Sequence, residues 1–299
     1  MGYLGGVVEA DDYRRNHFKK VYTNIKFFKT VEDSLIDLGE FDAFIVATPA
    51  STHFKIAKIL IENNKHVLVE KPFTLNSYDA KILDDLASEK NITLMVGHVF
   101  LFHPAFIKIK QLIENGTLGK IQYLYSNRLN LGTIRFEEDV FWSFAPHDIA
   151  LFQWLIGTFP EHIDSNGVDI IQKEIHDTSI TTLKYSQNIM GHIYVSWLHP
   201  FKEHRFVVIG SKGMISFEDS LKNRPLTFYD KTIIWDNGVP VPQDKSEELI
   251  DFDSTMPLEN ELRYFIEHFE EKKIDKCTGQ SAIEVVKILE KASKRIVDR

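Results

Sequence analysis

The stretch His66-Val67-Leu68-Val69-Glu70-Lys71-Pro72 decides the fold class of this chain. Its first part is a short apolar run that includes two valines, as in a strand buried on both faces of a sheet. Glu70 and Lys71 follow at the carboxyl end of that strand, where open parallel sheets bind their ligands. Pro72 favours an extended backbone at Lys71. We therefore predict a lysine at the ligand-binding edge of a parallel sheet, although the tripeptide alone also fits a solvated strand end with a chance Glu–Lys pair.

Similar runs and helical patterns alternate through the first hundred residues. Further short apolar runs lie at residues 4–8, 43–47 and 92–96. Helical patterns lie between them at residues 54–62 and 77–86, and Asn76 is a candidate N-cap for the second. Strands that alternate with helices predict an α/β domain with a parallel sheet, which we assign to residues 1–97.

The pattern changes after about residue 98. Pro104 is expected to begin a helix that ends at Gly116. Longer, partly alternating runs follow at residues 120–130, 179–185, 189–198, 206–209, 214–217 and 233–235. They predict an α+β domain over residues 98–299 with a mainly antiparallel sheet. Residues 219–253 are polar and predict long loops, and two helices, about 258–272 and 281–297, are expected to close the chain.

Composition excludes several classes of protein. The 299 residues suffice for about two domains. The formal net charge of −8 argues against a nucleic-acid partner. A single cysteine, Cys277, excludes a disulfide framework and favours a reducing cytoplasm. No apolar run approaches the about 18 residues of a membrane span, and the start lacks the features of a signal peptide. His98 and His103 lack the spacing of a zinc site, so we expect no metal.

Three further groups are candidates for a site. Thr48-Pro49 follows the run at 43–47, and its small side chains allow a flat ligand to approach, although Ser51 or Thr52 also fits a plain N-cap. Pro146 is expected to begin a helix, which would place His147 in the first turn, where the helix dipole lowers the imidazole pKa and favours a neutral general base. A structural histidine is the alternative. Arg128 can pair with a phosphate or carboxylate, or be an ordinary surface arginine.

These motifs in this order resemble the glucose–fructose oxidoreductase/inositol dehydrogenase (Gfo/Idh/MocA) superfamily. The resemblance rests on the strand before Glu70-Lys71-Pro72, the strand end Ala47-Thr48-Pro49 and the downstream pair His147-Asp148. It implies an NAD-binding Rossmann domain followed by a large open sheet used in homodimer or homotetramer contacts. Residues 97–104 and 126–155 further resemble the branch that oxidises C3 of UDP-N-acetylglucosamine, or of its uronic acid, in bacterial surface-polysaccharide synthesis.

The resemblance also implies roles for individual residues. Lys71 matches the family's catalytic lysine, and His147 its catalytic histidine. The implied cofactor positions are Glu9, Thr48, Pro49, His53, Glu70 and Lys71. The candidate substrate contacts are His98, Arg128, Asn130, Ser143 and His147. Many family members have an aspartate four residues before the histidine, where this chain has Ser143, so a proton relay through an aspartate is not implied.

The start of the chain departs from the family pattern. Residues 4–8 match the second strand of the family, and Glu9 matches the acidic residue that follows the glycine motif by roughly 20 residues. Counting back from Glu9 passes Met1, and Gly5-Gly6 lies within the expected strand. We therefore expect the chain to lack the first strand, the pyrophosphate loop and the first helix, and we favour a truncated fragment over a natural short enzyme.

The leading hypothesis is NAD-dependent oxidation of a secondary hydroxyl, C3, on a UDP-N-acetyl amino sugar or its uronic acid. His147 would accept the hydroxyl proton, while Lys71 would hold the oxygen or serve as the base. The Glu9 carboxylate repels a 2′-phosphate and favours NAD over NADP, with Arg14 and Arg15 nearby as the counter-argument. Two alternatives remain: a dehydrogenase of inositol or a free sugar, and a non-catalytic ligand sensor or decayed copy.

Overall fold

The computed structural model describes residues 3–37, 41–223, 225–271 and 274–297. It divides into two compact units. The first comprises Met1–Gly97 with Glu261–Ile283, and the second comprises His98–Asn260 with Glu284–Arg299. The sequence pattern assigns all of residues 98–299 to the second domain, whereas Glu261–Ile283 belong to the first unit.

The segment Glu261–Ile283 belongs to the first unit because it bonds to the edge strand of that unit's sheet. The backbone N–H of Val96 donates to the carbonyl of Cys277 at 2.8 Å, and Met95 forms an isolated antiparallel bridge with Thr278. The Thr93 hydroxyl donates to the carbonyl of Phe269 at 2.7 Å. An exposed strand edge carries unpaired N–H and C=O groups, and this returning segment covers them.

The strands of the first unit are parallel and form two separate sheets. The two-stranded sheet contains β1 (Gly6–Val8) and β2 (Lys26–Phe28). The three-stranded sheet contains, in this order, β3 (Ala43–Val46), β4 (His66–Glu70) and β5 (Leu94–Gly97). The central strand that begins the expected family fold is not among the described residues, and its omission or loss stays a prediction.

Four helices connect these strands. They are α1 (Asp12–Val21), α2 (Val31–Asp37), α3 (Ala50–Glu62) and α4 (Ser77–Glu89). The predicted cap of α4 is confirmed, because the Asn76 side chain accepts a hydrogen bond from the Asp79 N–H at 2.8 Å. The sequence pattern did not identify α1, β2 or α2, which are short and mostly exposed. The predicted alternation of strands and helices is otherwise confirmed.

The second unit contains one large sheet of eight strands in the order β13-β12-β11-β10-β6-β9-β8-β7. The strands are β6 (Ile121–Leu131), β7 (His162–Val168), β8 (Thr178–Lys184), β9 (Met190–Ser196), β10 (Leu198–Gly210), β11 (Met214–Glu218), β12 (Leu226–Asp236) and β13 (Val239–Leu249). All neighbouring pairs are antiparallel except β6 with β9. The predicted mainly antiparallel sheet is therefore confirmed.

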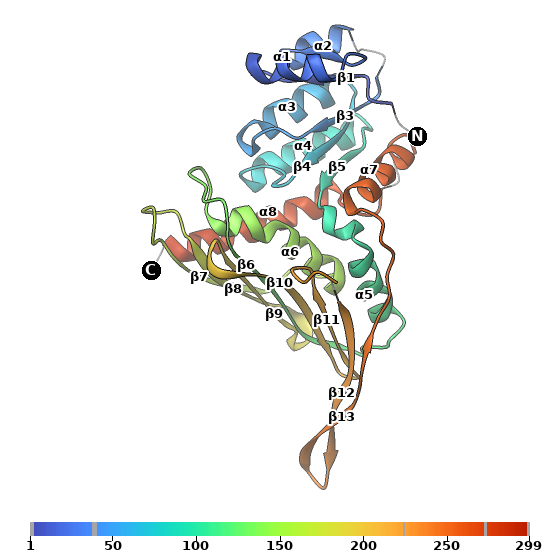
Figure 1. The fold of residues 1–299 in the computed structure, drawn as a ribbon, viewed down its shortest axis with the longest axis vertical. Helices are drawn as coiled ribbons and strands as arrows, with labels where there is room; N and C mark the ends of the chain where they lie inside the picture. The colour runs from blue at the N-terminus through green and yellow to red at the C-terminus, as the bar shows by residue number, and fades with distance from the viewer. Residues whose placement is uncertain (1–2, 38–40, 224, 272–273, 298–299) are drawn as a thin grey trace. The chain divides into compact units, whose positions relative to one another are not determined.

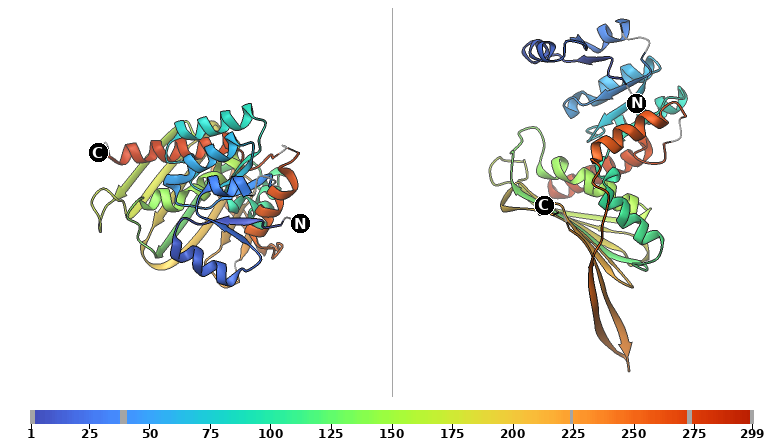
Figure 2. Two further views of the ribbon diagram at one scale, coloured as in Figure 1. Left: turned by 90° about the horizontal axis from the view of Figure 1, so that it is seen from above. Right: turned by 45° about the vertical axis from the view of Figure 1, so that its right-hand side comes forward.

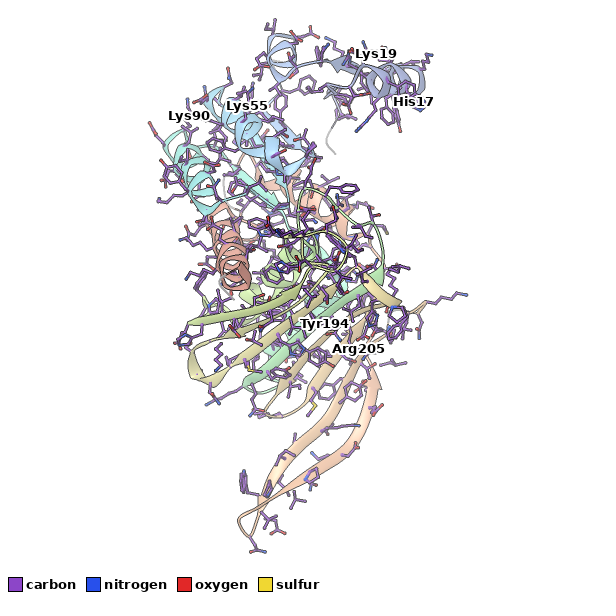
Figure 3. The ribbon with its side chains drawn as sticks, turned by 90° about the vertical axis from the view of Figure 1, so that its left-hand side faces the viewer. His17, Lys19, Lys55, Lys90, Tyr194 and Arg205 are labelled. Carbon is purple, nitrogen blue, oxygen red and sulfur yellow. The ribbon has the colours of Figure 1, made fainter. Side chains whose placement is uncertain are left out.

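Helices cover one face of this sheet (Figure 1). They are α5 (Pro104–Glu114), α6 (Val140–Ile156) and the part of α8 (Gly279–Val297) that belongs to this unit. The packing is close: a Cβ added at Gly191 of β9 would lie 2.7 Å from the Phe152 ring of α6. Figure 3 labels Tyr194 on β9 and Arg205 on β10. Along each strand, more exposed residues such as these alternate with buried ones.

The prediction of long loops over residues 219–253 is wrong. This segment forms β12 and β13, an antiparallel hairpin that extends beyond the rest of its sheet (Figures 1 and 2). Asn237 and Gly238 both have positive φ, 48° and 81°, as the two central residues of a type I′ hairpin turn require. Asn-Gly is a strong hairpin signal, and the polar, mostly exposed surface of β13 masked it.

The prediction that Pro146 begins a helix is also wrong. The helix α6 begins after Asp139, whose side chain accepts from the Trp142 N–H at 2.9 Å. Pro146 lies inside α6, and His147 therefore lies in the middle of the helix. A helix tolerates an internal proline where tertiary packing compensates for the missing N–H, and Pro146 is buried. The helix N-terminus accordingly has no direct effect on His147.

Candidate active site

The carboxyl edge of the three-stranded sheet carries most of the predicted cofactor positions. Thr48-Pro49 follows β3, Glu70 ends β4 and Lys71 comes next, and Gly97 ends β5. Parallel strands place their carboxyl ends at one edge, so these groups share one side of the sheet. Thr48 and Pro49 are exposed and Lys71 is half-buried, so this edge presents small and cationic groups to a ligand.

His53 connects two of the segments that form this edge. The side chain is 1% exposed, and its two ring nitrogens face the carbonyl oxygens of Pro72 at 2.9 Å and Thr48 at 2.8 Å. The ring therefore ties the segment after β3 to the segment after β4. The structure gives His53, predicted as a cofactor position, the role of holding Thr48 and the Lys71-Pro72 segment in place.

Helix α3 begins at this edge with hydroxyl groups around its first turn. Its N-cap is Pro49, which makes no side-chain capping hydrogen bond. The Thr48 and Thr52 hydroxyl oxygens lie 2.7 Å apart, and the Thr52 hydroxyl donates to the Pro49 carbonyl at 2.7 Å. The two threonines therefore add polar groups at the edge where a flat ligand can approach.

Glu70 is held against the neighbouring strand end. A Cβ added at Gly97 would lie 3.0 Å from a Glu70 carboxylate oxygen and 3.3 Å from its Cα, so a larger residue at position 97 would crowd Glu70. The same carboxylate oxygen accepts from the Lys71 backbone N–H at 3.3 Å. The Glu70 side chain is thus folded back beside its own strand end.

Glu9 lies at the end of β1 in the other sheet of this unit. Its backbone N–H donates to the Phe28 carbonyl at 3.0 Å, and its carboxylate accepts from the Asp11 N–H at 2.8 Å. The Arg15 guanidinium donates to the Glu9 carbonyl at 2.7 Å and also pairs with Asp12. Because Arg15 is engaged in these contacts, Glu9 remains the acidic group at this strand end, as NAD preference requires.

The second unit contains a buried ion pair next to the predicted histidine. Asp148 is 0% exposed and accepts three hydrogen bonds: from the Ser126 hydroxyl at 2.7 Å, and from Arg128 Nε at 2.6 Å and Nη2 at 3.1 Å. Two parallel N–H bonds to one carboxylate fix the guanidinium in orientation. Arg128 is therefore committed to Asp148 and is no ordinary surface arginine.

Aromatic rings connect this ion pair to His147. The Arg128 guanidinium carbon lies 4.4 Å from the centre of the Phe100 ring, a cation–π contact. The Phe100 ring centre lies 4.7 Å from that of His147, and the His98 ring centre lies 6.4 Å from it. Three of the five predicted substrate contacts, His98, Arg128 and His147, thus gather in one cluster.

The other two predicted substrate contacts lie on the same elements. Asn130 follows Arg128 along β6, and its side-chain oxygen is buried without a hydrogen-bond partner among the described residues. Ser143 lies on α6 and is 5% exposed. An unsatisfied buried acceptor costs free energy, so the amide oxygen of Asn130 is available to a donor on a ligand.

The sequence did not single out two residues that are notable in the structure, one for its ring contacts and one for its burial. Phe100 lies within the stretch 97–104, but its place between Arg128 and His147 depends on tertiary packing. Glu261 is fully buried in the first unit, and its position on a helix near the end of the chain gave no local signal. In both cases the informative contacts are distant in sequence.

The first unit has groups that fit a dinucleotide. The hydroxyls at Thr48 and Thr52, the carboxylate of Glu70 and the ammonium of Lys71 are the polar types that bind ribose and nicotinamide groups at a sheet edge. The described residues contain no group of three or more His, Cys, Asp or Glu arranged to hold a metal ion. Among those same residues, no helix has the length and apolar character needed to cross a membrane.

Models of protein families match both parts of the chain. Residues 4–98 match a model described as "Oxidoreductase family, NAD-binding Rossmann fold". Residues 106–216 match a model described as "GFO/IDH/MocA C-terminal domain". Together the two matches cover most of the chain and follow each other in the order that the sequence pattern predicts.

Relatives with named activities include two kinds of dehydrogenase. Myo-inositol 2-dehydrogenase of Thermotoga maritima is 26% identical over 233 residues, which are 74% of this chain and 70% of that protein. UDP-N-acetylglucosamine 3-dehydrogenase of Acidithiobacillus ferrooxidans is 35% identical over 132 residues, which are 44% of this chain and 41% of that protein.

Solved structures share the fold over almost the whole chain. UDP-N-acetylglucosamine 3-dehydrogenase GnnA from Acidithiobacillus ferrooxidans superposes with a TM-score of 0.83 at 23% identity, covering 98% of this chain and 89% of that one. The WlbA dehydrogenase from Bordetella pertussis, solved with NADH and UDP-GlcNAcA, gives 0.78 at 18% identity, covering 99% and 89%. At these identities the likeness shows the fold. With both family models matched in order, the chain is a member of the Gfo/Idh/MocA family of NAD-binding oxidoreductases.

Proposed function

We propose that this chain oxidises a secondary hydroxyl, C3, of a UDP-N-acetyl amino sugar or its uronic acid, with NAD as the oxidant. The observation that carries the proposal is the half-buried Lys71 directly after β4, at the carboxyl edge of the sheet matched by the NAD-binding family model. Relatives named as UDP-N-acetylglucosamine 3-dehydrogenases support the choice of sugar. We also expect a homodimer or homotetramer, which light scattering would detect.

In the proposed chemistry, the hydride of the carbinol carbon and the proton of its hydroxyl go to two different acceptors. Bound NAD supplies an acceptor for the hydride from the carbinol carbon. Lys71 holds the hydroxyl oxygen through its ammonium, and a ring nitrogen of His147 accepts the hydroxyl proton. The carbinol loses a hydride and a proton and becomes a ketone, so atoms and charge balance. If Lys71 is neutral when substrate binds, it serves as the base in place of His147.

The second unit supports His147 in this role. Arg128 and Phe100 form a layered support beside the imidazole, and Asp148 fixes the guanidinium through two hydrogen bonds. A catalytic base acts efficiently only when its ring is held in the productive orientation. We therefore assign Arg128 to holding this support. We keep Asn130, whose amide oxygen has no hydrogen-bond partner among the described residues, as the better candidate for a direct contact to the sugar.

Removal of the Lys71 ammonium is the main test of the proposal. Lys71→Met should lower the rate of NADH formation from UDP-N-acetylglucosamine by at least about 10²-fold, as expected when a group acting on the transferred proton is lost. The matched control is Lys81→Met, because Lys81 is an exposed lysine on α4 that pairs with Asp85. That control should keep the wild-type rate. Near-normal turnover by Lys71→Met would overturn the mechanism.

A myo-inositol 2-dehydrogenase matches a larger share of the chain than the nucleotide-sugar enzyme does, which favours inositol as the second candidate substrate. Comparing NADH formation with UDP-N-acetylglucosamine, its uronic acid and myo-inositol separates the candidates. NAD binding is measured first by fluorescence titration of the 299-residue chain. Cofactor binding without turnover of any of the three substrates would favour the non-catalytic sensor.

A further inference from the structure

His204 of β10 lies directly opposite Arg128 of β6, and the proposed chemistry does not use it. The two residues are register partners in the antiparallel pair of β10 with β6. Side chains of directly opposite residues stand on the same face of a sheet, with their Cβ atoms about 5 Å apart. Because Arg128 bonds to Asp148 of α6, this is the face that the helices cover. His204 is therefore a neighbour of the ion pair that supports His147.

The helix layer ends just before His204 on this face of the sheet. Two residues further into the sheet, the register partners Ser126 and Phe206 are 2% and 3% exposed. The Phe206 ring packs edge-on against one ring of α5 and one ring of α6. Arg128, His204 and Asn130 are partly exposed by contrast. These three side chains therefore form a polar opening at the edge of the helix layer.

His204 is held at this opening as an uncharged imidazole. Its backbone N–H donates to the Glu218 carboxylate at 3.3 Å, and its carbonyl accepts from the Asp219 N–H at 2.9 Å. Burial lowers the pKa of the His204 ring to about 4, and the positive charge of Arg128 acts in the same direction. An uncharged imidazole has one N–H donor and one acceptor nitrogen. Because the side chain is only half-buried, a ligand can reach these groups.

The charges around this opening balance each other. Two cations and two carboxylates act on the His204 ring, namely Arg128, Lys202, Asp148 and Asp219. The Arg128 guanidinium also makes two hydrogen bonds to Asp148, so its charge is already compensated. Asn130 adds an amide oxygen that has no hydrogen-bond partner among the described residues. The opening therefore offers uncharged hydrogen-bonding groups and no net positive charge.

We propose that His204 contacts the sugar and, together with Asn130, selects a sugar that carries no carboxylate. This inference rests on the proposed function, because it takes the opening beside Arg128 as part of the sugar site. Sugar hydroxyl and acetamide groups donate and accept hydrogen bonds, as the imidazole and the amide do. A carboxylate at this point would lose its water and face the Asn130 oxygen without a net positive charge in compensation, which costs free energy. The opening therefore favours UDP-N-acetylglucosamine over its uronic acid.

Steady-state kinetics test the contact between His204 and the sugar. In His204→Leu the KM for UDP-N-acetylglucosamine should rise by up to about tenfold, because one hydrogen bond is lost, while kcat changes by less than about twofold. His204→Gln keeps a neutral donor and acceptor, so both constants should stay close to those of the wild type. The matched control His162→Leu, at an exposed position of β7 in the same sheet, should change neither constant. An unchanged KM in His204→Leu would overturn the contact.

A comparison of the two nucleotide sugars tests the selection. The wild-type kcat/KM should be at least about tenfold higher for UDP-N-acetylglucosamine than for its uronic acid, because the site gives the carboxylate no counter-charge. His204→Lys places a cation at the opening and should move this ratio towards the uronic acid. A wild type that shows no preference, or prefers the uronic acid, would overturn the selection.

NMR of the histidine rings separates failure of this inference from failure of the proposed function. The resonance that is lost in His204→Gln should keep the position of a neutral ring until the pH falls towards 4, whereas titration near the ordinary value of 6.5 would contradict the uncharged imidazole at any level of activity. With NADH present, the same resonance should shift when UDP-N-acetylglucosamine is added. If the enzyme oxidises only myo-inositol, a shift with myo-inositol keeps the contact and rejects the nucleotide sugar. If His204→Leu does not fold, this resonance decides, and no shift with either ligand would overturn the inference.

Discussion

Two buried carboxyls, one in each unit, have opposite surroundings. Asp148 and Glu261 are both 0% exposed. Asp148 accepts three hydrogen bonds, two of them from a guanidinium, whereas Glu261 accepts none among the described residues. A buried charge with a full set of donors is stable as a charge, and one without donors takes up a proton. The second unit thus contains a buried carboxyl with three donors, and the first a buried carboxyl whose pKa is raised.

The difference in hydrogen bonding between Asp148 and Glu261 matches a difference in the groups that each carboxyl acts on. Asp148 fixes Arg128, which lies on the Phe100 ring beside His147, so two parallel hydrogen bonds hold this support in one orientation. Burial and the negative charge of Glu70 at the end of β4 together raise the pKa of Glu261, so the protonation of Glu261 changes with pH. The comparison predicts that the contribution of Asp148 to stability depends on its partner Arg128, and that the contribution of Glu261 depends on pH.

The largest expected effect comes from removing the partner of Asp148. Arg128→Met keeps much of the aliphatic side chain and leaves the buried carboxylate with only the Ser126 hydroxyl as a donor. Removing one member of a buried pair leaves an uncompensated charge, and the free energy of unfolding should fall by about 3–5 kcal/mol. Urea denaturation at neutral pH measures this loss.

A second variant shows whether the loss comes from the charge. In Arg128→Met combined with Asp148→Asn the uncompensated charge is gone, so the double variant should be more stable than Arg128→Met alone. Arg128→Lys should rescue only in part, because an ammonium cannot form the two parallel bonds. A loss below about 1 kcal/mol in Arg128→Met would mean that the pair behaves as a surface contact.

The next effect concerns the pH dependence of stability at Glu261. Its folded pKa, about 8, lies above the ordinary value of 4.5, so the native state binds more protons than the unfolded state between these values. The stabilisation is full below about pH 4.5 and decreases as the pH rises toward 8. In this window the wild type should lose up to about 1.4 kcal/mol per pH unit relative to Glu261→Gln.

Urea denaturation at several pH values measures this slope as a difference between the two proteins. Taking the difference cancels the contributions of the other titrating groups, which both proteins share. Glu267→Gln, at an exposed position of α7 (Pro257–His268), should run parallel to the wild type. A difference between the wild type and Glu261→Gln that does not change with pH would show that Glu261 is ionised in the folded state.

Local signals in the sequence predicted the strand ends but not these carboxyls. The run before Glu70-Lys71-Pro72 placed the lysine at a sheet edge because strand burial and strand ends are properties of neighbouring residues. The pairing of Arg128 with Asp148 depends on how β6 packs against α6, and the position of Glu261 depends on a return of the chain to the first unit. No local pattern encodes either contact.

Two predictions are wrong for different reasons. Pro146 is a good helix start by local rules, yet the cap at Asp139 begins α6 earlier and the tertiary packing tolerates the proline. The turn at Asn237-Gly238 was a local signal that was available, but the polar composition around it favoured loops over a hairpin. Here strand pairing, and not burial of the strands, accounts for the structure.

The smallest expected effect comes from an ion pair that is equally short but exposed. Lys81 and Asp85 are one turn apart on α4 with 2.8 Å between their charged atoms, and their side chains are 64% and 60% exposed. Lys81→Met should lower the free energy of unfolding by no more than about 0.5 kcal/mol, because water and salt screen the pair in both states. The closest contact of Arg128 with Asp148, at 2.6 Å, is hardly shorter, yet the predicted loss is several times larger. If urea denaturation gave similar losses for Lys81→Met and Arg128→Met, contact distance and not burial would determine the strength of these pairs, and the contrast drawn for Asp148 and Glu261 would lose its physical basis.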